Sequence, residues 1–234
     1  MLRLATTSPR RIELLSLLGA PFEAVAPGID ERAFASPALG KAQAVARPGA
    51  VTIGADTEVL LGGERIGKPA DLEDAVRMLH RLAGRDHDVR TEVAIVGATG
   101  RRLRFAVRSR VRTKPRDDAA IERYVGTGEA LGKAGAYNIH GLGGELIEAY
   151  WGCYANIVGL PLCHLYFALR KMGVAMPERP EPAFERAYGF RCPGWEHARW
   201  QGRHVRDGIE YESWRDTLGS PLSAQVMDAG WTAR

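Results

Sequence analysis

The sequence predicts an α/β fold, and three observations carry this prediction. Short runs rich in β-branched residues alternate with segments of helical periodicity over roughly the first three quarters of the chain. The stretch Val51–Pro69 contains two apolar runs joined by Gly62-Gly63, which is typical of a β-hairpin with a tight two-residue turn. Arg102–Thr113 alternates apolar and arginine side chains, as a strand with one buried face does. A sheet with helices packed against it accounts for all three patterns.

The composition fits one large domain, or one domain with an appendage. The chain has 234 residues, of which 45% are hydrophobic. No apolar run is long enough to span a membrane, and the first residues lack the charged-then-apolar pattern of a signal peptide. Three scattered cysteines are too few for a disulfide framework. We therefore expect a cytoplasmic protein with no membrane partner.

The chain is expected to open with a strand over Leu2–Thr6 and a helix that ends at Gly19. Thr7 or Ser8 suits the N-cap, and Pro9 suits the first helical turn. A helix N-terminus presents free N–H groups and the positive end of its dipole, which together favour an anion. The groups that could contact an anion there are Thr6, Ser8, Arg10 and Arg11. The alternative is a capped helix with two solvated arginines, and the strand–turn–helix pattern alone does not decide between them.

The predicted hairpin brings a carboxylate and an ammonium together. Asp56 follows the first short run of the hairpin and Lys68 lies at its exit, so both are expected at the same end of the sheet. Ligands usually bind at such strand ends in α/β sheets. The chain has 27 arginines and only 5 lysines, which draws attention to a lysine at this place. The two groups could hold a metal ion and phosphates, although the pair alone favours a salt bridge at a strand end.

Periodicity and turn residues place the remaining elements in order. They are a strand over Phe22–Ala26, helices over Pro37–Ala46, Asp71–Leu82 and Asp117–Val125, paired strands over His87–Val96 and Arg102–Thr113, a strand over Leu146–Tyr150, and a helix that ends near Gly173. The predicted helix over Pro37–Ala46 carries Lys41, and the turn before it carries Glu31. The glycine-rich passage Gly126–Gly141 would let a backbone approach a ligand closely. Its Lys133 and Tyr137 could contact phosphate and base, or the passage could be only a flexible loop.

Two features lie outside this pattern. Five arginines on one face of the 102–113 strand could mark a nucleic-acid surface, but no aromatic residues interleave for base stacking, so a solvated face is favoured. From Met176 onward the chain has several prolines and little periodicity. We therefore divide it into a domain over residues 1–175 and an appendage over residues 176–234 that packs on the domain or is partly disordered.

Several of these passages together resemble the Maf family, the septum-formation-inhibitor-like nucleoside triphosphate pyrophosphatases. They occur in the family's order between residues 2 and 173. The matching passages are Leu4–Arg11, Asp30–Glu31, Lys41–Ala42, Gly54–Thr57, Gly67–Pro69, Tyr124–Val125, Gly128–Glu129, Lys133–Tyr137 and Asn156–Leu162. Each passage is short, but the ordered set is highly specific.

The resemblance implies a mixed twisted sheet with flanking helices and two lobes around a central cleft, similar to the inosine-triphosphate-pyrophosphatase group. It also implies a house-cleaning hydrolase of nucleotide metabolism that converts nucleoside triphosphates to monophosphate and pyrophosphate with a divalent cation, Mg²⁺ or Mn²⁺. It assigns catalytic roles to Asp56, Glu31, Lys41 and Lys68, with the two lysines on the phosphates. Asp56 and Glu31 are the expected metal ligands, and Asp56 is either the general base that takes a proton from water or chiefly a metal ligand. The substrate contacts that it implies are Thr6, Ser8, Arg10, Arg11, Thr57, Lys133, Tyr137 and His140.

Arg10 together with Thr57 resembles the branch of the family that acts on dTTP, UTP and related pyrimidine nucleotides. His140 stands where that branch usually has glutamine, and Gly132 stands where an aspartate is usual. The hypothesis is therefore a pyrophosphatase for pyrimidine or modified nucleoside triphosphates. The alternative, which the two departures keep open, is a catalytically impaired nucleotide-binding regulator of cell division and septum formation. A homodimer is left open.

Overall fold

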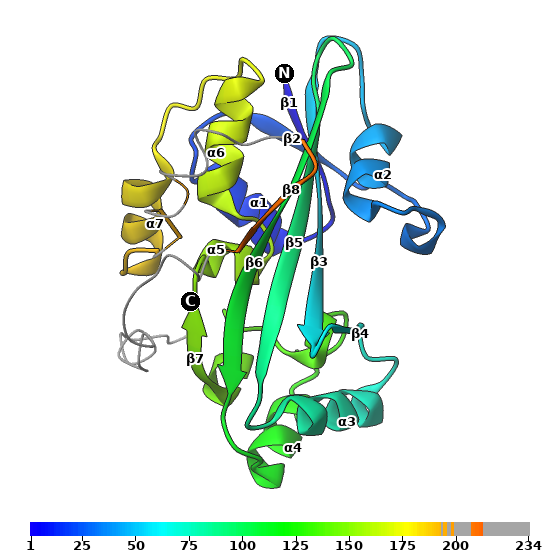
Figure 1. Ribbon diagram of the computed structural model, residues 1–234, viewed down its shortest axis with the longest axis vertical. Coiled ribbons are helices and arrows are strands. Elements are labelled where there is room, and N and C mark those ends of the chain that lie inside the picture. Colours follow the sequence, from blue (N-terminus) through cyan, green and yellow to red (C-terminus); the bar gives the residue numbers. More distant parts are fainter. Residues whose placement is uncertain (193, 196–197, 199–206, 213–234) are drawn as a thin grey trace.

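The computed structural model describes residues 1–192, 194–195, 198 and 207–212 (Figure 1). In this part of the chain, eight strands form one sheet in the order β2-β1-β3-β5-β6-β7, with β4 beside β3 and β8 beside β6. The strands are β1 (Leu2–Ala5), β2 (Phe22–Val25), β3 (Val51–Leu61), β4 (Glu64–Ile66), β5 (Asp86–Val96), β6 (Arg102–Thr113), β7 (Ile147–Trp151) and β8 (Ile209–Glu212). The sheet is mixed, because β1 pairs in parallel with β2 and β3, whereas β3, β5, β6 and β7 pair in antiparallel order.

Helices flank the sheet, and their starts follow from the sequence. They are α1 (Pro9–Ser16), α2 (Pro37–Ala44), α3 (Leu72–Leu82), α4 (Asp118–Gly126), α5 (Tyr154–Val158), α6 (Leu162–Lys171) and α7 (Pro180–Tyr188), with short 3₁₀ helices at Glu31–Ala33, Ala134–Ala136 and Leu142–Leu146. The Asp71 side chain caps α3 as predicted, because it accepts a hydrogen bond from the N–H of Asp74. Ser36 and Asp117 cap α2 and α4 in the same way.

The long strands β3, β5 and β6 run the length of the molecule and join its parts (Figure 1). The helix α2 packs against β3 and β5 on one face of the sheet, and α1, α5 and α6 lie on the other face. Successive side chains of a strand point to opposite faces, so neighbouring residues of β3 contact different helices. Asp56 accordingly meets Lys41 of α2, whereas Thr57 meets Arg11 of α1.

The helix α2 lies unusually close to β3 because the facing side chains are small. A Cβ atom added at Gly54 would lie only 2.1 Å from the carbonyl oxygen of Ala38. Ala38, Ala42 and Ala94 are fully buried in this contact. Glycine is therefore required at residue 54 for the close approach. The same approach carries Lys41 onto the strand beside Asp56.

A gap in the pairing of β3 creates the cleft. On the edge opposite β5, β1 pairs with Val51–Gly54 and β4 pairs with Val59–Leu61. Within the described residues, Ala55–Glu58 has no strand partner on this edge. One lobe (β1, β2, α1, α2) lies beyond the gap on one side, and the other lobe (β4, α3, α4) lies on the other side (Figure 1). The predicted mixed sheet, with flanking helices and two lobes around a central cleft, is thereby confirmed.

The predicted hairpin exists, but its first strand is longer than expected. Gly54-Ala55 does not end the strand, because β3 continues to Leu61 and pairs with β5 along most of its length. Asp56 therefore lies in the middle of a strand, and the prediction that it sits at a strand end is wrong. The carboxylate is accessible all the same, because the free edge of β3 begins beside it.

Part of the predicted appendage packs on the rest of the protein. Phe184 and Tyr188 of α7, and Tyr211 of β8, are buried in the main hydrophobic core. The strand β8 pairs in parallel with β6. The prediction that the appendage is partly disordered concerns residues outside those described, and the boundary near residue 175 stays a prediction. Within the described ranges, no helix combines the length and the apolar content that crossing a bilayer requires.

The arginine face of β6 is occupied by acidic partners. Arg110 and Arg112 pair with Asp88 and Asp86 of β5, at 3.1 Å and 2.6 Å. Arg108 contacts both Asp88 and the β8 residue Glu210. These ion pairs offset the positive charge that binding a phosphate backbone would need. The face that the sequence predicts to be solvated is thus paired with acidic side chains, and the absence of a nucleic-acid partner stays a prediction.

Candidate active site

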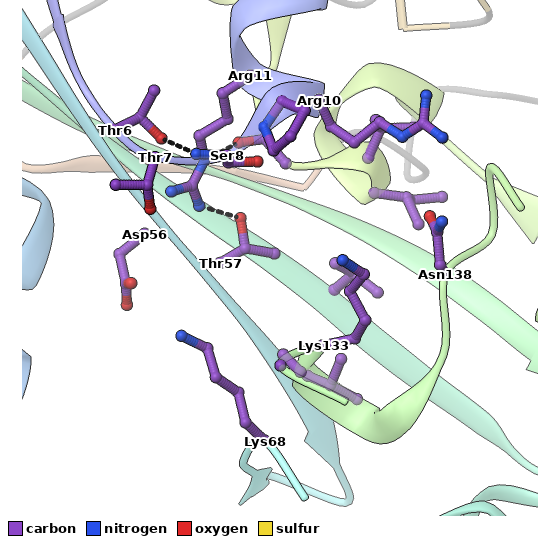
Figure 2. A pocket seen from close by; sticks show the side chains of 18 of the residues that line it. Thr6, Thr7, Ser8, Arg10, Arg11, Asp56, Thr57, Lys68, Lys133 and Asn138 are labelled. Carbon is purple, nitrogen blue, oxygen red and sulfur yellow. Dashed lines mark hydrogen bonds between the residues drawn. The ribbon is translucent and has the colours of Figure 1, made fainter. Parts of the chain in front are cut away.

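A cavity of about 360 Å³ lies at the free edge of β3, between the two lobes (Figure 2). Its size is within the range of small-molecule sites. Every site residue predicted from the sequence lines it except His140: Thr6, Ser8, Arg10, Arg11, Glu31, Lys41, Asp56, Thr57, Lys68, Lys133 and Tyr137. The lining comes from the β1–α1 junction, the 3₁₀ helix after β2, α2, β3, the loop after β4, the glycine-rich passage and α5.

An ammonium group bridges two carboxylates at one end of the cavity. The Lys41 Nζ lies 2.8 Å from Asp56 Oδ1 and 2.9 Å from Glu31 Oε1. The same ammonium lies 3.4 Å from the carbonyl oxygen of Ala55. Lys41 is only 5% exposed, so this charge is buried and needs both partners. The sequence favoured a salt bridge between Asp56 and Lys68, but among the described residues Asp56 pairs instead with Lys41 and, at 3.6 Å, with Arg65.

The start of α1 provides uncapped N–H groups at the wall of the cavity. Ser8 is the N-cap residue, as predicted, but its side chain makes no hydrogen bond to the helix. Its backbone N–H donates to Thr6 Oγ1 at 3.0 Å instead (Figure 2). Pro9 has no N–H, so the first free donors of the helix are those of Arg10 and Arg11. An anion in the cavity could accept hydrogen bonds from both N–H groups.

The Arg11 side chain is fixed by hydrogen bonds to Gly159 and to Thr57 of β3. Its Nε donates to the carbonyl of Gly159 at 2.9 Å, and its NH2 donates to Thr57 Oγ1 at 3.0 Å (Figure 2). The Thr57 hydroxyl lies 2.9 Å from that of Thr91, which donates to the carbonyl of Asn156. Thr57 must then donate to Thr91, so its hydroxyl proton is already used. Burial lowers the pKa of Arg11, although Asp56 and Glu31 oppose this shift.

The lysines of the second lobe are brought together by a backbone contact. The N–H of Gly135 donates to the carbonyl of Gly67 at 2.9 Å, which joins the loop of Lys68 to the loop of Lys133. Within the described part of the chain, neither lysine forms an ion pair, and both line the cavity (Figure 2). Ala136 adopts a φ of 58°, a left-handed conformation that is strained for alanine and typical of ligand-binding loops.

Tyr137 lines the cavity with its ring, but its hydroxyl group is engaged elsewhere. The hydroxyl lies 2.8 Å from His87 Nε2 in the core, and both side chains are buried. The Tyr137 hydroxyl is therefore engaged within the core, and a substrate contact by this residue stays a prediction. Burial lowers the pKa of His87 to about 4.

The buried His87 predicts a loss of stability in mild acid. A histidine in the unfolded chain has a pKa near 6.5, whereas His87 in the folded protein has a pKa of about 4. Between these two pH values the unfolded chain binds a proton that the folded protein does not bind, which favours unfolding. The free energy of unfolding should therefore fall, as pH drops from 6.5 to 5, with a slope approaching ~1.4 kcal/mol per pH unit from this group. Urea titrations of the wild type and His87→Gln across this range measure the slope. The variant should show a shallower slope, and parallel curves would contradict the account.

The structure does not bring His140 into the cavity. The imidazole is 8% exposed and packs against the rings of Tyr154 and Tyr188, with centroid distances of 6.4 Å and 5.0 Å. His140 therefore lies outside the cavity lining, and its direct contact with a substrate stays a prediction. The physical reason for its burial is that α7, which the sequence did not reveal as a helix, covers the side chain. Burial and the nearby charge of Arg10 lower the pKa of His140 to about 4, so it is neutral at pH 7.

Asn138 and Gly159 are among the lining residues that the sequence prediction missed. Asn138 faces the cavity below Arg10 (Figure 2), and its amide donates to Glu129 Oε1, which orders the loop. The carbonyl oxygen of Gly159 accepts a hydrogen bond from Arg11 Nε. The φ of 124° at Gly159 favours glycine at this position. Asn138 follows the Lys133–Tyr137 passage directly, but nothing in its spacing distinguished it from a loop residue.

The carboxylates at this end of the cavity suit a hard divalent cation. Among the described residues, no three His, Cys, Asp or Glu side chains cluster in a way that could hold a metal. Glu31 and Asp56 supply oxygen ligands only, and both reach the same ammonium. Mg²⁺ commonly binds one or two carboxylates and completes its shell with water and substrate phosphates, whereas structural zinc needs four protein ligands. The donor set therefore fits Mg²⁺ or Mn²⁺ brought in with a phosphate ligand.

Comparisons with known proteins find a family model and relatives that match most of this chain. The family model described as Maf-like protein matches residues 1–172. A dTTP/UTP pyrophosphatase of Pelotomaculum thermopropionicum is 44% identical over 182 residues, which cover 73% of this chain and 95% of the relative. A dTTP/UTP pyrophosphatase of Dictyoglomus turgidum is 45% identical over 186 residues, or 74% of this chain and 96% of the relative. The Ham1 protein structure from Staphylococcus aureus aligns with 48% of this chain and 71% of its own, at 12% identity and a TM-score of 0.39.

Proposed function

The chain belongs to the Maf family, and on that premise we propose that its cleft hydrolyses pyrimidine nucleoside triphosphates to monophosphate and pyrophosphate. The observation that carries the proposal is the buried Lys41 between Asp56 and Glu31, at the end of a cavity that also presents two lysines without ion pairs in the described chain. The catalytic unit proposed is the domain over residues 1–175. A cytoplasmic location and a homodimer stay predictions.

The triphosphate would bind across the gap between the lobes. It brings about four negative charges, which require several cationic partners. Lys68 and Lys133 approach from one lobe, and the start of α1 with Arg11 approaches from the other (Figure 2). Because the Arg11 guanidinium is already fixed by Gly159 and Thr57, little side-chain freedom is lost when a phosphate arrives. This arrangement favours binding of the phosphates near Asp56.

The reaction would proceed by attack of water on the α-phosphorus. Asp56 uses Oδ1 for Lys41, and its Oδ2, which lies 3.6 Å from Arg65 NH2, would orient the water and accept its proton. The new bond joins the water oxygen to the α-phosphorus, while the bond to the bridging oxygen breaks and pyrophosphate leaves. Lys68 and Lys133 are placed to stabilise the negative charge on the departing group.

Asp56 and Glu31 are the residues that would hold a divalent cation. A bound Mg²⁺ or Mn²⁺ supplies charge neutralisation of the phosphates and polarises the phosphoryl oxygens. Lys41 keeps the two carboxylates together in the protein itself, so the pair is ordered before a cation arrives.

The pyrimidine preference rests on the relatives and on the residues at the far end of the cavity. The relatives named dTTP/UTP pyrophosphatase align over almost their whole length with this chain. Arg10 and Asn138 line the end of the cavity away from Asp56 (Figure 2). A guanidinium donates hydrogen bonds and suits the carbonyl oxygens of uracil and thymine.

Pyrophosphate release across a panel of triphosphates tests the proposal. The purified protein with Mg²⁺ or Mn²⁺ is expected to release pyrophosphate from dTTP and UTP faster than from ATP and GTP. Selective release would support both the activity and the base preference. Binding of nucleotides with no release from any of them would favour the alternative, a nucleotide-binding regulator.

A further inference from the structure

The end of the cavity lined by Arg10 and Asn138, where we propose that the nucleobase binds, is connected to a helix outside the family match. Glu13 of α1 uses one carboxylate oxygen to accept from Arg10 NH1 at 2.9 Å. Its other oxygen accepts from the Tyr188 hydroxyl at 3.1 Å. Tyr188 is the last residue of α7, whereas the family model ends at residue 172. A residue of the C-terminal segment thus reaches the cavity lining through a single intermediate side chain.

Tyr188 is rigid enough to hold its partner in place. It is 7% exposed and stacks on Phe184 of the same helix, with ring centroids 4.3 Å apart and planes 11° from parallel. Its edge contacts His140, with centroids 5.0 Å apart. The chain entering α7 is fastened to the end of α1, because the N–H of Glu178 donates to the carbonyl of Leu18 at 3.1 Å. The hydroxyl is therefore presented to Glu13 from a fixed position.

Of Arg10 and His140, which both lie near the Glu13 carboxylate, only Arg10 carries a positive charge at pH 7. His140 Nε2 lies 3.8 Å from Glu13, but burial and Arg10 keep this imidazole neutral near pH 7. Arg10 has a 37% exposed side chain on a flexible stem, so without Glu13 its guanidinium would sample many directions. Glu13 holds this guanidinium by a hydrogen bond, and Arg10 lies at the end of the cavity that Asn138 also lines (Figure 2).

We propose that Tyr188 is a positioning residue that fixes Arg10 through Glu13 and so sharpens the selection of the nucleobase. The inference rests on the proposed function, and it adds the C-terminal helix α7 to the recognition site. Fixing a long side chain before binding removes an ordering cost that the substrate would otherwise meet. The family model ends at residue 172, so α7 lies outside the part of the chain that matches the family.

Tyr188→Phe tests the inference, because it removes the hydroxyl and keeps the stacked ring. The KM for dTTP and UTP should rise about three- to ten-fold, and kcat should change less than about two-fold. Inorganic tripolyphosphate, which has no base, should inhibit the variant and the wild type with the same constant. Glu13→Gln should raise the KM in the same direction, and the double variant should add little to the larger single effect.

Arg186→Gln is the matched control on the same helix. Arg186 pairs with Glu178 and is 63% exposed, so its removal should leave KM unchanged. An unchanged KM in Tyr188→Phe would overturn the inference while the activity stands. A tripolyphosphate constant that rises in step with KM would also overturn it, because a loosened cleft rather than a misplaced Arg10 would be responsible.

Binding measurements separate this inference from the proposed function. If the wild type releases no pyrophosphate, the proposed hydrolysis fails, and dissociation constants for dTTP and tripolyphosphate replace the kinetics. A Tyr188→Phe variant that binds dTTP more weakly and tripolyphosphate equally well would still support the positioning role. Equal binding of dTTP by both proteins would overturn it.

Discussion

Replacing Asp56 with asparagine should lower kcat for pyrophosphate release by about 10³-fold, since the amide cannot take a proton from the attacking water. The substitution is nearly isosteric, and the amide oxygen can still accept a hydrogen bond from Lys41 Nζ, which lies 2.8 Å away in the wild type. At a saturating concentration of divalent cation, the KM for dTTP should change by no more than about three-fold, because the lysine and arginine side chains that contact the phosphates are untouched. Initial rates at saturating and limiting dTTP measure both constants.

Glu58→Gln is the matched control for this loss. Glu58 lies two residues further along β3, on the same face of the strand, and pairs with Arg65 and Arg90 outside the cavity. It should retain kcat within about two-fold. A residual activity of Asp56→Asn above a tenth of the wild type would contradict the assigned role of Asp56.

Replacing Lys41 with methionine should have the second largest effect, and on stability as well as on rate. The variant keeps the length of the side chain but leaves Asp56 and Glu31 facing each other without the ammonium between them. Removing one partner from a buried ion pair costs about 3 kcal/mol. We expect a loss of that size in the free energy of unfolding, measured by urea titration without divalent cations, and a kcat at least about 10²-fold lower.

The same variant reports on the metal site without measuring activity. A divalent cation can replace the missing positive charge, so Mg²⁺ should raise the unfolding midpoint of Lys41→Met more than that of the wild type. Lys114→Met, at an exposed lysine outside the cleft, should respond to Mg²⁺ as the wild type does. An equal response in Lys41→Met would contradict the assignment of Asp56 and Glu31 as the cation ligands.

The sequence could predict the outline of the fold because its signals are local. The Asp71 side chain caps the N–H of Asp74, three residues later, and Gly62-Gly63 forms the turn of a hairpin. The strand over residues 102–113 shows in the alternation of its side chains. Each of these patterns involves residues that are only a few positions apart. The length of β3 could not be predicted in this way. Gly54 resembles a break in the chain, but its smallness instead serves the packing of α2, a contact with Ala38 that depends on the folded sheet.

The candidate site could be predicted as a list of residues but not as an arrangement. The sequence named Lys41, Asp56 and Glu31 without showing that one ammonium bridges both carboxylates. It offered Thr57 as a substrate contact, whereas the folded protein uses this hydroxyl to hold Arg11. These roles depend on partners that are distant along the chain, so no local pattern could reveal them.

The burial of His140 could not be predicted from the sequence for the same reason. Its cover comes from Tyr188, which is 48 positions later in a segment with little periodicity. Recognition of α7 as a helix would have required knowing that Phe184 and Tyr188 are buried against α5 and the glycine-rich passage. Tertiary contacts, rather than intrinsic helix preference, stabilise this short helix.

Hydrolysis of dTTP in ¹⁸O-labelled water tests the central claim most directly. If water attacks the α-phosphorus in the cleft beside Asp56, the label should appear in dTMP and the pyrophosphate should remain unlabelled, as mass spectrometry of the two products would show. Label in the pyrophosphate, or release of dTDP and inorganic phosphate, would place the attack at another phosphorus and contradict the account.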